Sequence, residues 1–322
     1  MKATTFFFSL FFAATTLPAA DILPSWNEGP VKSALTSFIA NAQSENSDGY
    51  IPPAERIAVF DNDGCLWSEQ PLYFQAYFIL DRVKEMASDH PEWKSTQPYQ
   101  AILEGDKETM KTWGHNELLE VAMATHTGMT EEEFAQRVRQ WISTAKHPET
   151  GMRFVDMTFQ PMKELLQALR DAGFKTYIVS GGGVSFIRPW AEAAYGIPPE
   201  QVVGSRVKVE YQEGGSLRRI PEIDLIDDKE GKPVGIYQVI GRRPVFAAGN
   251  SDGDFQMLEY TTTGQGPRLG LLVHHTDADR EFAYDRESHI GKLNRGLDEA
   301  EARGWIVVDM AKDWKTVYGE SN

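Results

Sequence analysis

Short apolar runs alternate along the chain with segments whose apolar residues recur every three or four positions. Five runs have the length and the β-branched or aromatic character of strands: 57–60, 175–179, 244–248, 268–275 and 305–309. Helical spacing predicts helices over 31–42 and 159–172 and another from about Ser185, and Arg206–Arg219 alternates as a hairpin does. Strands that alternate with helices predict an α/β fold, a three-layer α/β/α Rossmann-like core around a parallel sheet.

The segment between the first two strands is much longer than the roughly 30 residues of a βαβ crossover unit. Helical spacing within it predicts helices over 71–87, 99–113, 116–125 and 131–145. Thr130 followed by Glu133 is the pattern of an N-terminal capping box for the last of these helices. We therefore expect an α-helical cap over 68–151, inserted into a core made of 21–67 and 152–322.

The first 20 residues differ from the rest of the chain in composition. They contain one lysine, an apolar run too short to span a bilayer, and small residues at Ala19 and Ala20. This layout is typical of a secretory signal peptide, so we expect cleavage there and no membrane contact afterwards. Cys65 is the single cysteine, which excludes a disulfide within the chain. An exported protein without disulfides is typical of the bacterial periplasm.

The overall composition is that of a globular protein, with 41% apolar and 25% charged residues in 322. The formal net charge of −15 repels polyanions, which argues against a nucleic acid or an anionic membrane as a partner. A small anionic substrate would have to be held by local cations against this overall field.

Two carboxylates stand directly after the first strand. Asp61 and Asp63 are one residue apart, and the backbone turns at Gly64, so both side chains can face one pocket. Two acids held close together are costly unless a cation or a shared proton offsets their repulsion. Asp61 and Asp63 are therefore candidate catalytic residues.

The stretch Asp61–Cys65, Asp-Asn-Asp-Gly-Cys, resembles the first motif of the haloacid dehalogenase superfamily of phosphohydrolases, Asp-x-Asp-Gly-Thr. Later stretches resemble the other three motifs in the same order: Ser180 the second, Lys232 the third, and Gly249–Asp254 the fourth. With four motifs in order, the chain is identified as a member of the superfamily, most similar to the phosphoserine-phosphatase type with a helical cap.

The resemblance implies a role for each acid and for the lysine. Asp61 would be the nucleophile and would form an aspartyl-phosphate, and Asp63 would be the general acid and base. Lys232 would hold the phosphate and steady the Asp61 carboxylate. The substrate would be a small phosphomonoester.

The glycine-rich stretch after the second strand offers a phosphate cradle. Ser180 and the amides of Gly181 and Gly182 precede a helix start, where backbone donors can approach an anion. Lys229 lies near enough to Lys232 in sequence to be the alternative third-motif lysine.

An all-oxygen ligand set predicts Mg²⁺ as the cofactor. Asp61, Asp63 through its backbone carbonyl, Asn250 and Asp254 are the candidate ligands. The superfamily commonly has aspartate where this chain has Asn250, whose amide oxygen is neutral. We expect Asn250 to touch the metal and Asp254 to lie behind it, with direct ligation by Asp252 as the competing assignment.

Trp67, Glu69 and Tyr73 follow the nucleophile and are candidates for contact with the organic part of the substrate. An aromatic ring beside a carboxylate suits a cationic amine, such as a serine or choline phosphate head. The alternative is that Trp67 and Tyr73 pack the hinge between core and cap.

The function predicted from sequence is a magnesium-dependent phosphomonoester hydrolase. One alternative is a phosphotransferase or phosphomutase that uses the same intermediate, and another is a non-catalytic phosphoester-binding protein. A dehalogenase is less consistent with the sequence, because that branch generally lacks the second aspartate, here Asp63.

Overall fold

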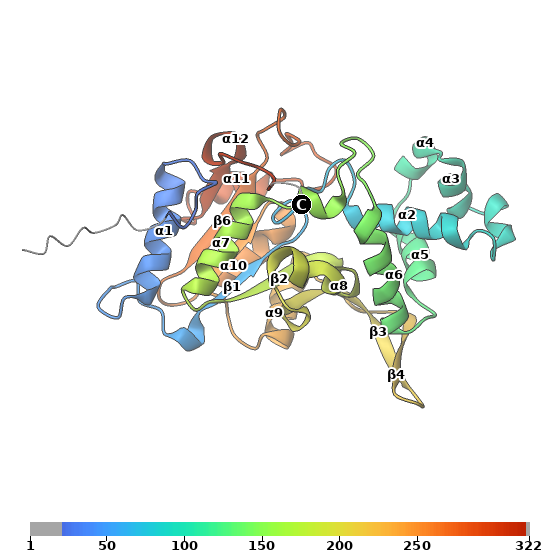
Figure 1. The fold of residues 1–322 in the computed structure, drawn as a ribbon, viewed down its shortest axis with the longest axis horizontal. Coiled ribbons are helices and arrows are strands. Elements are labelled where there is room, and N and C mark those ends of the chain that lie inside the picture. Colours follow the sequence, from blue (N-terminus) through green and yellow to red (C-terminus); the bar gives the residue numbers. More distant parts are fainter. Residues whose placement is uncertain (1–20, 320–322) are drawn as a thin grey trace, which may run out of the picture.

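The computed structural model describes residues 21–319, whose strands form one sheet in the order β4-β3-β2-β1-β5-β6-β7 (Figure 1). The strands are β1 (Ile57–Phe60), β2 (Lys175–Gly183), β3 (Val202–Gln212), β4 (Ser216–Leu225), β5 (Phe246–Gly249), β6 (Leu269–His274) and β7 (Ile306–Asp309). Neighbouring strands are parallel except β3 and β4, which form an antiparallel hairpin. The signal peptide predicted for 1–20 lies outside the described residues and stays a prediction.

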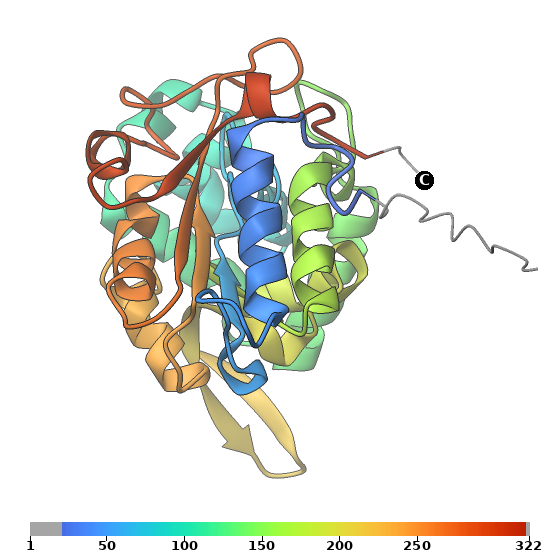
Figure 2. The ribbon, with the colours of Figure 1, turned by 90° about the vertical axis from the view of Figure 1, so that its left-hand side faces the viewer.

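Helices cover both faces of the sheet. One face carries α1 (Pro30–Gln43), α7 (Gln160–Asp171) and α8 (Val184–Tyr195); the other carries α9 (Gly231–Val239), α10 (Phe255–Thr262) and α11 (Arg295–Glu299). Phe60 of β1 packs in the first core and Val59 in the second, because successive strand residues point to opposite faces. Figure 2 shows α1 and α7 on the face turned to the viewer. The predicted three-layer α/β/α core is confirmed.

The long segment after β1 is helical, as predicted. It contains α2 (Phe74–Met86), α3 (Tyr99–Glu104), α4 (Lys107–Lys111), α5 (His115–His126) and α6 (Glu131–Thr144). A short helix, α12 (Met310–Asp313), follows β7, and single 3₁₀ turns occur at Pro53–Glu55, Pro91–Ser95, Phe154–Met157, Pro199–Gln201 and Asp252–Asp254. No helix in the described part of the chain has the length and apolar character that crossing a bilayer requires.

Local sequence signals explain where these helices begin and end. The hydroxyl of Thr130 accepts from the Glu133 amide at 3.1 Å, and the Glu133 carboxylate accepts from the Thr130 amide at 2.8 Å, which confirms the capping box. The single helix expected over 99–113 is divided in two. Gly105 ends the first helix with a left-handed φ of 70°, and Asp106 caps the second by accepting from the Thr109 amide.

The inserted helices belong to two hydrophobic clusters. Phe78 of α2 and Phe134 of α6 pack in the same core as α1, α7 and α8. Val83, on another face of α2, packs with Trp93 and Val121 in a smaller outer cluster. The inner part of the insertion is therefore continuous with the main core, and a separate cap over 68–151 stays a prediction.

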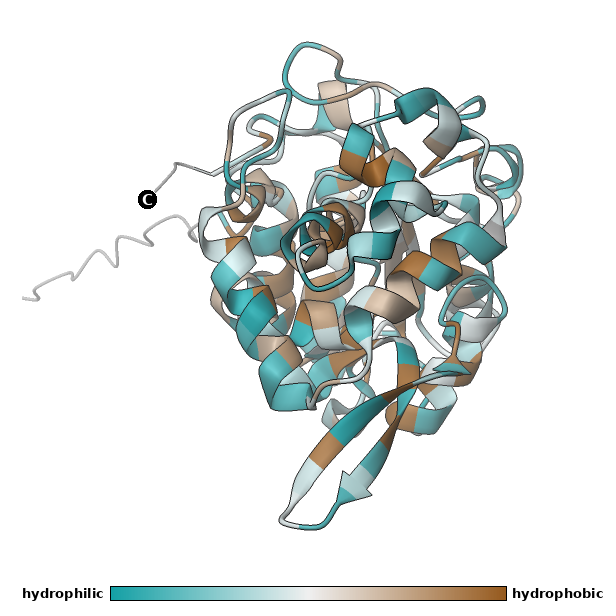
Figure 3. Cartoon of the chain, turned by 90° about the vertical axis from the view of Figure 1, so that its right-hand side faces the viewer, coloured by the Kyte–Doolittle hydropathy of each residue, from teal (hydrophilic) through white to brown (hydrophobic). Residues whose placement is uncertain are grey.

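The predicted hairpin is present and reaches the inserted helices. Figure 3 shows it as an arm below the body, with polar and apolar residues along it. Arg219 of β4 is 4% exposed; it donates to the carbonyl of His126 and, at 2.6 Å, to the Glu131 carboxylate, and lies 4.3 Å from the Phe134 ring centre. This Arg219 clasp ties the hairpin to α5 and α6.

The outer edge of β4 is interrupted. Backbone groups of residues 128–130 pair with Arg218 and Arg219, and further along the strand Pro221 has no N–H to donate. The register with β3 also shifts between Val207 and Val209. Edge strands are commonly protected in these ways.

Candidate active site

The predicted site residues meet at the carboxyl ends of the central strands. Phe60, the last residue of β1, pairs with Ile178 of β2 on one side and with Ala248 of β5 on the other. Asp61 follows it, and its amide donates to the Ala248 carbonyl at 2.9 Å. The ends of β2 and β5, with Ser180 and Asn250, therefore flank Asp61.

Lys232, at the start of α9, lies in the interior beneath Asp61. Its ammonium group, on a residue 2% exposed, donates to Asp61 Oδ1 at 2.7 Å, Asp254 Oδ1 at 2.5 Å and the Val179 carbonyl at 3.0 Å. All three N–H groups of a lysine are thereby used. Burial alone would lower the pKa of Lys232, but the charges of Asp254 and then of Asp61 raise it above its ordinary value. Lys229, the alternative, is exposed.

Asp254 lies behind the loop that follows β5. Its Oδ2 accepts from the amides of Asn250 at 2.9 Å and Ser251 at 3.0 Å, while Oδ1 faces Lys232. Its carboxylate therefore holds the loop and the lysine. Asp252 points elsewhere, because its carboxylate accepts from the amides of residues 294–296 at the start of α11.

Asp63 is held by Trp67. The Trp67 indole N–H donates to Asp63 Oδ1 at 2.8 Å, and the indole ring stacks on Trp190 with centres 4.4 Å apart. The other oxygen, Oδ2, lies 3.4 Å from the position that a Cβ on Gly182 would take. Burial raises the pKa of Asp63 to about 6, although the bond from Trp67 opposes the rise. Trp67 is thus buried behind Asp63.

The glycine-rich stretch is the end of β2 rather than a free turn. Register with β3 shifts between Ser180 and Gly183, and α8 begins at Val184. The Ser180 hydroxyl accepts from the Gly182 amide at 3.0 Å, and the Gly183 amide donates to Gln75 Oε1 at 2.7 Å. Sequence analysis missed Gln75, because a glutamine on a helix of ordinary amphipathic pattern carries no motif.

Glu69 contacts Asn250 rather than the opening of the site. Its carboxylate oxygen Oε1 accepts from Asn250 Nδ2 and from the Tyr284 hydroxyl, both at 2.7 Å, and the residue is 2% exposed. Tyr284 lies in the loop after β6 and carried no sequence signal. Of the three substrate-contact candidates, only Tyr73 remains well exposed, at 39%.

The site contains more negative than positive charge. Lys232 contacts the carboxylates of Asp61 and Asp254, and Asp63 and Glu69 are further buried carboxyl groups close enough to Asp61 to affect its charge or be affected by it. Burial, followed by the Asp254 charge, raises the pKa of Asp61 well above its usual range, and burial also raises the pKa of Glu69. A divalent cation would offset this excess of buried negative charge.

The donor atoms fit such a cation. Asn250 Oδ1 is buried and has no hydrogen-bond partner among the described residues, while its Nδ2 is bound to Glu69. Within 21–319, no group of three or more His, Cys, Asp or Glu side chains is arranged as a metal site. The candidate set is instead one carboxylate oxygen of Asp61, the amide oxygen of Asn250 and backbone oxygen, a hard set that suits Mg²⁺.

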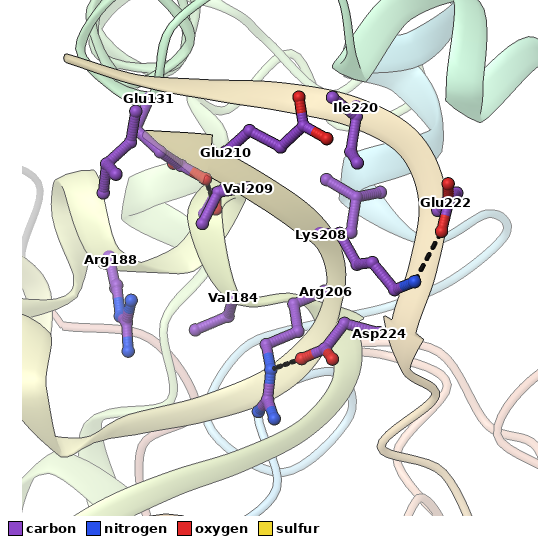
Figure 4. Close-up of a pocket in the computed structure, with 13 residues that line it drawn as sticks. Glu131, Val184, Arg188, Arg206, Lys208, Val209, Glu210, Ile220, Glu222 and Asp224 are labelled. Atoms are coloured by element: carbon purple, nitrogen blue, oxygen red, sulfur yellow. Dashed lines mark hydrogen bonds and ion pairs between the residues drawn. The ribbon is translucent and has the colours of Figure 1, made fainter. Parts of the chain in front are cut away.

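A groove beside the hairpin is lined by other residues. Figure 4 shows Arg206 paired with Asp224 and Lys208 paired with Glu222 across its walls. The Arg188 Nε donates to the Pro199 carbonyl at 2.9 Å. Arg206 and Lys208 are thus already paired with carboxylates, whereas Arg188 donates to backbone carbonyls. None of the residues that line the groove is one of the predicted site residues.

The family model for haloacid dehalogenase-like hydrolases matches residues 58–259, which is more than half of the chain. The chain belongs to this family. The superfamily and the hydrolase class predicted from sequence are thereby confirmed for this haloacid dehalogenase-like hydrolase.

Solved structures resemble the fold. A conserved protein of unknown function from Anaerococcus prevotii is 18% identical, with a TM-score of 0.53 over 77% of this chain and 86% of that one. A phosphoserine phosphohydrolase-like protein from Francisella tularensis is 17% identical, with a TM-score of 0.40 over 77% of this chain and 98% of that one. Comparison of this chain with curated proteins finds no match.

Proposed function

We propose that this hydrolase removes phosphate from small phosphomonoesters with Mg²⁺, through an aspartyl-phosphate on Asp61. The observation that carries the proposal is the placement of Asp61 at the end of β1, 2.7 Å from the buried ammonium of Lys232. Asp63 lies beside it with one oxygen directed toward the glycine-rich end of β2. A nucleophile and a proton donor are thus adjacent, beside the glycine-rich end of β2.

In the first step, an Asp61 carboxylate oxygen attacks phosphorus and the bond from phosphorus to the ester oxygen breaks. Lys232 keeps Asp61 oriented through Oδ1 and so favours its ionised form. Asp63 gives its proton to the leaving alkoxide. Its pKa, raised by burial to about 6, favours the protonated form more than an exposed aspartate would.

In the second step, water attacks the phosphorus of the aspartyl-phosphate. Asp63, now ionised, takes a proton from that water, and the bond from phosphorus to Asp61 breaks to release inorganic phosphate. The Trp67 N–H on Oδ1 leaves Oδ2 free for both proton transfers.

The metal would be held by Asp61, the backbone carbonyl of Asp63 and Asn250 Oδ1. When bound, Mg²⁺ would offset the repulsion between the Asp61 carboxylate and the anionic phosphate. The buried, unpaired Asn250 Oδ1 supports this assignment.

The test uses the purified protein with p-nitrophenyl phosphate, first with Mg²⁺ and then with EDTA. We expect metal-dependent release of inorganic phosphate, and a loss of at least about a thousandfold in kcat in Asp61→Asn, because the amide cannot act as the nucleophile. Circular dichroism checks that the variant is folded.

The control is Asp224→Asn, which neutralises a carboxylate of the hairpin groove. Its rate should stay within about twofold of wild type. An Asp61→Asn rate close to wild type would refute the nucleophile assignment. With an added alcohol, formation of a phosphorylated alcohol would indicate a transferase, and binding without turnover would indicate a phosphoester-binding protein.

A further inference from the structure

Asn250 brings a neutral amide to the candidate metal site, and a carboxylate lies directly behind it. We propose that Glu69 is a positioning residue that orients the Asn250 amide and supplies the negative charge that this amide lacks. The inference rests on the proposed function, because it concerns the Mg²⁺ of that site.

The hydrogen-bond pattern fixes which way the amide faces. Asn250 Nδ2 donates to Glu69 Oε1 at 2.7 Å, so Oδ1 must point away from Glu69. A flipped amide would place two oxygen atoms in contact and leave a buried N–H without a partner. The Tyr284 hydroxyl donates to the same Glu69 oxygen at 2.7 Å and keeps the carboxylate in place.

Two glycines leave the space that this pair occupies. A Cβ on Gly64, which has a φ of 72°, would lie 2.0 Å from Asn250 Nδ2 and 2.4 Å from Glu69 Oε1. A Cβ on Gly291, with a φ of 62°, would lie 1.9 Å from Glu69 Oε1. A Cβ at either position would force the end of the Glu69 or Asn250 side chain to move, so glycine at both positions leaves room for this pair.

The charge of Glu69 reaches the metal site through one hydrogen bond. A carboxylate that accepts from an amide N–H polarises the amide and makes its oxygen a better ligand for a cation. At 2% exposure, a negative charge on Glu69 is screened little by solvent, and a cation at the site would offset the effect of burial, which raises the pKa of Glu69. The Asn250 amide, hydrogen-bonded to the Glu69 carboxylate, thus takes the place of a carboxylate bound directly to the metal.

The experiment measures the affinity for Mg²⁺ alone by isothermal titration calorimetry at pH 7.5. Glu69→Gln keeps an acceptor for Asn250 but removes the charge, so the Kd should rise about tenfold. Asn250→Asp alone sets two carboxylates at hydrogen-bond distance, so its Kd should also rise although a charge has been added.

The decisive variant exchanges the two groups. When Glu69→Gln and Asn250→Asp are combined, the amide at position 69 donates to the carboxylate at position 250, which reverses the direction of the native bond and leaves the total charge unchanged. The Kd of this double variant should return to within about threefold of wild type. The difference between this Kd and the one expected if the two substitutions acted independently measures how strongly residues 69 and 250 are coupled. A merely structural role for Glu69 would not be rescued by this exchange.

Asp252→Asn is the matched control, because it neutralises a carboxylate of the same loop that contacts α11 instead. Its Kd should stay within about twofold of wild type. The inference is overturned if Asp252→Asn weakens Mg²⁺ as much as Glu69→Gln, if Asn250→Asp alone binds more tightly, or if the double variant is no better than Glu69→Gln. Absence of Mg²⁺ binding by the wild type would instead refute the proposed metal.

Discussion

Lys232 places an ammonium group where water does not reach it, between Asp61 and Asp254. A buried ion pair adds little net stability compared with apolar residues, because desolvation offsets the attraction. Removal of one partner is costly, because the remaining charges have no compensation. The site thus makes the fold depend on Lys232.

Lys232→Met should lower the free energy of unfolding by about 3 to 5 kcal/mol at pH 7. The pKa of Asp61 lies above its unfolded value, so its contribution to stability is present at low pH and is lost as pH rises. The loss of unfolding free energy in Lys232→Met, measured by urea unfolding, should therefore be smaller at pH 5 than at pH 8. Lys229→Met, at an exposed lysine, is the control and should change stability by less than about 0.5 kcal/mol. A deficit that grows on acidification would contradict this account.

Site residues that carry a motif could be found from sequence, and their supports could not. Asp61, Lys232 and the loop to Asp254 follow strand ends in a recognisable order, and the parallel sheet brings such ends together. Glu69 was noticed, but it was expected to face the substrate. Its actual partner, Asn250, is 181 positions away, and one sequence contains no signal for a hydrogen bond over that separation.

At the level of elements, α5 ends at a histidine that joins three parts of the structure. His126 is 6% exposed; its Nε2 lies 3.0 Å from Gln75 Nε2 of α2, and its Nδ1 lies 2.9 Å from the Thr125 hydroxyl. Gln75 Nε2 can only donate, so Nε2 of the ring accepts and the imidazole is neutral. Burial, followed by the charge of Arg219, lowers the pKa of His126 to about 3.

Acid should therefore weaken the fold through His126. Its folded pKa lies below the unfolded value, so its stabilising effect is present above about pH 6.5 and is lost as pH falls toward 3. In His126→Gln, which does not titrate, stability should fall less between pH 7 and pH 5, by up to about 1.4 kcal/mol per pH unit below 6.5.

Urea midpoints at pH 7, 6 and 5 provide the measurement for His126→Gln. The control is His289→Gln, at an exposed histidine, whose pH dependence should match wild type. If stability falls equally with pH in wild type and His126→Gln, the buried imidazole of His126 is not the cause of the acid sensitivity.

Helices and strands were predicted well where the spacing of apolar residues determines them. The five apolar runs overlap five of the strands, of which β2 and β5 extend beyond their runs, and the Thr130 signal marks the start of α6. The division of 99–113 into α3 and α4 depends on Gly105 adopting a left-handed φ, which the residue permits but does not require. Similarly, the stretch Ser180–Gly183 continues β2 because Ser205, with Gly183 as its register partner, extends the pairing with β3.

In the whole molecule, the Arg219 clasp joins the hairpin to the inserted helices. Sequence could not reveal it, because Arg218 and Arg219 are adjacent arginines in an alternating segment and only their depth differs. Arg218 is exposed, whereas Arg219 is buried against Phe134.

Arg219→Met should loosen this connection without unfolding the sheet. The amide of Gly128, which donates to the Arg219 carbonyl at 3.0 Å, and the backbone of 126–134 should exchange hydrogen faster. We expect a loss of about 1 to 3 kcal/mol, since Glu131 can turn to solvent. Hydrogen exchange followed by mass spectrometry provides the readout, with Arg218→Met as the control; equal protection in both variants would exclude a role for the clasp.

The interrupted edge of β4 also bears on how separate molecules meet. An open strand is a template on which another copy can add its own, and repeated addition leads to fibres. Here the backbone groups of Arg218 and Arg219 that another strand would pair with are already paired with residues 128–130, and Pro221 has no N–H to donate. Crowding many copies together should therefore not let their sheets merge into a continuous layer along this side.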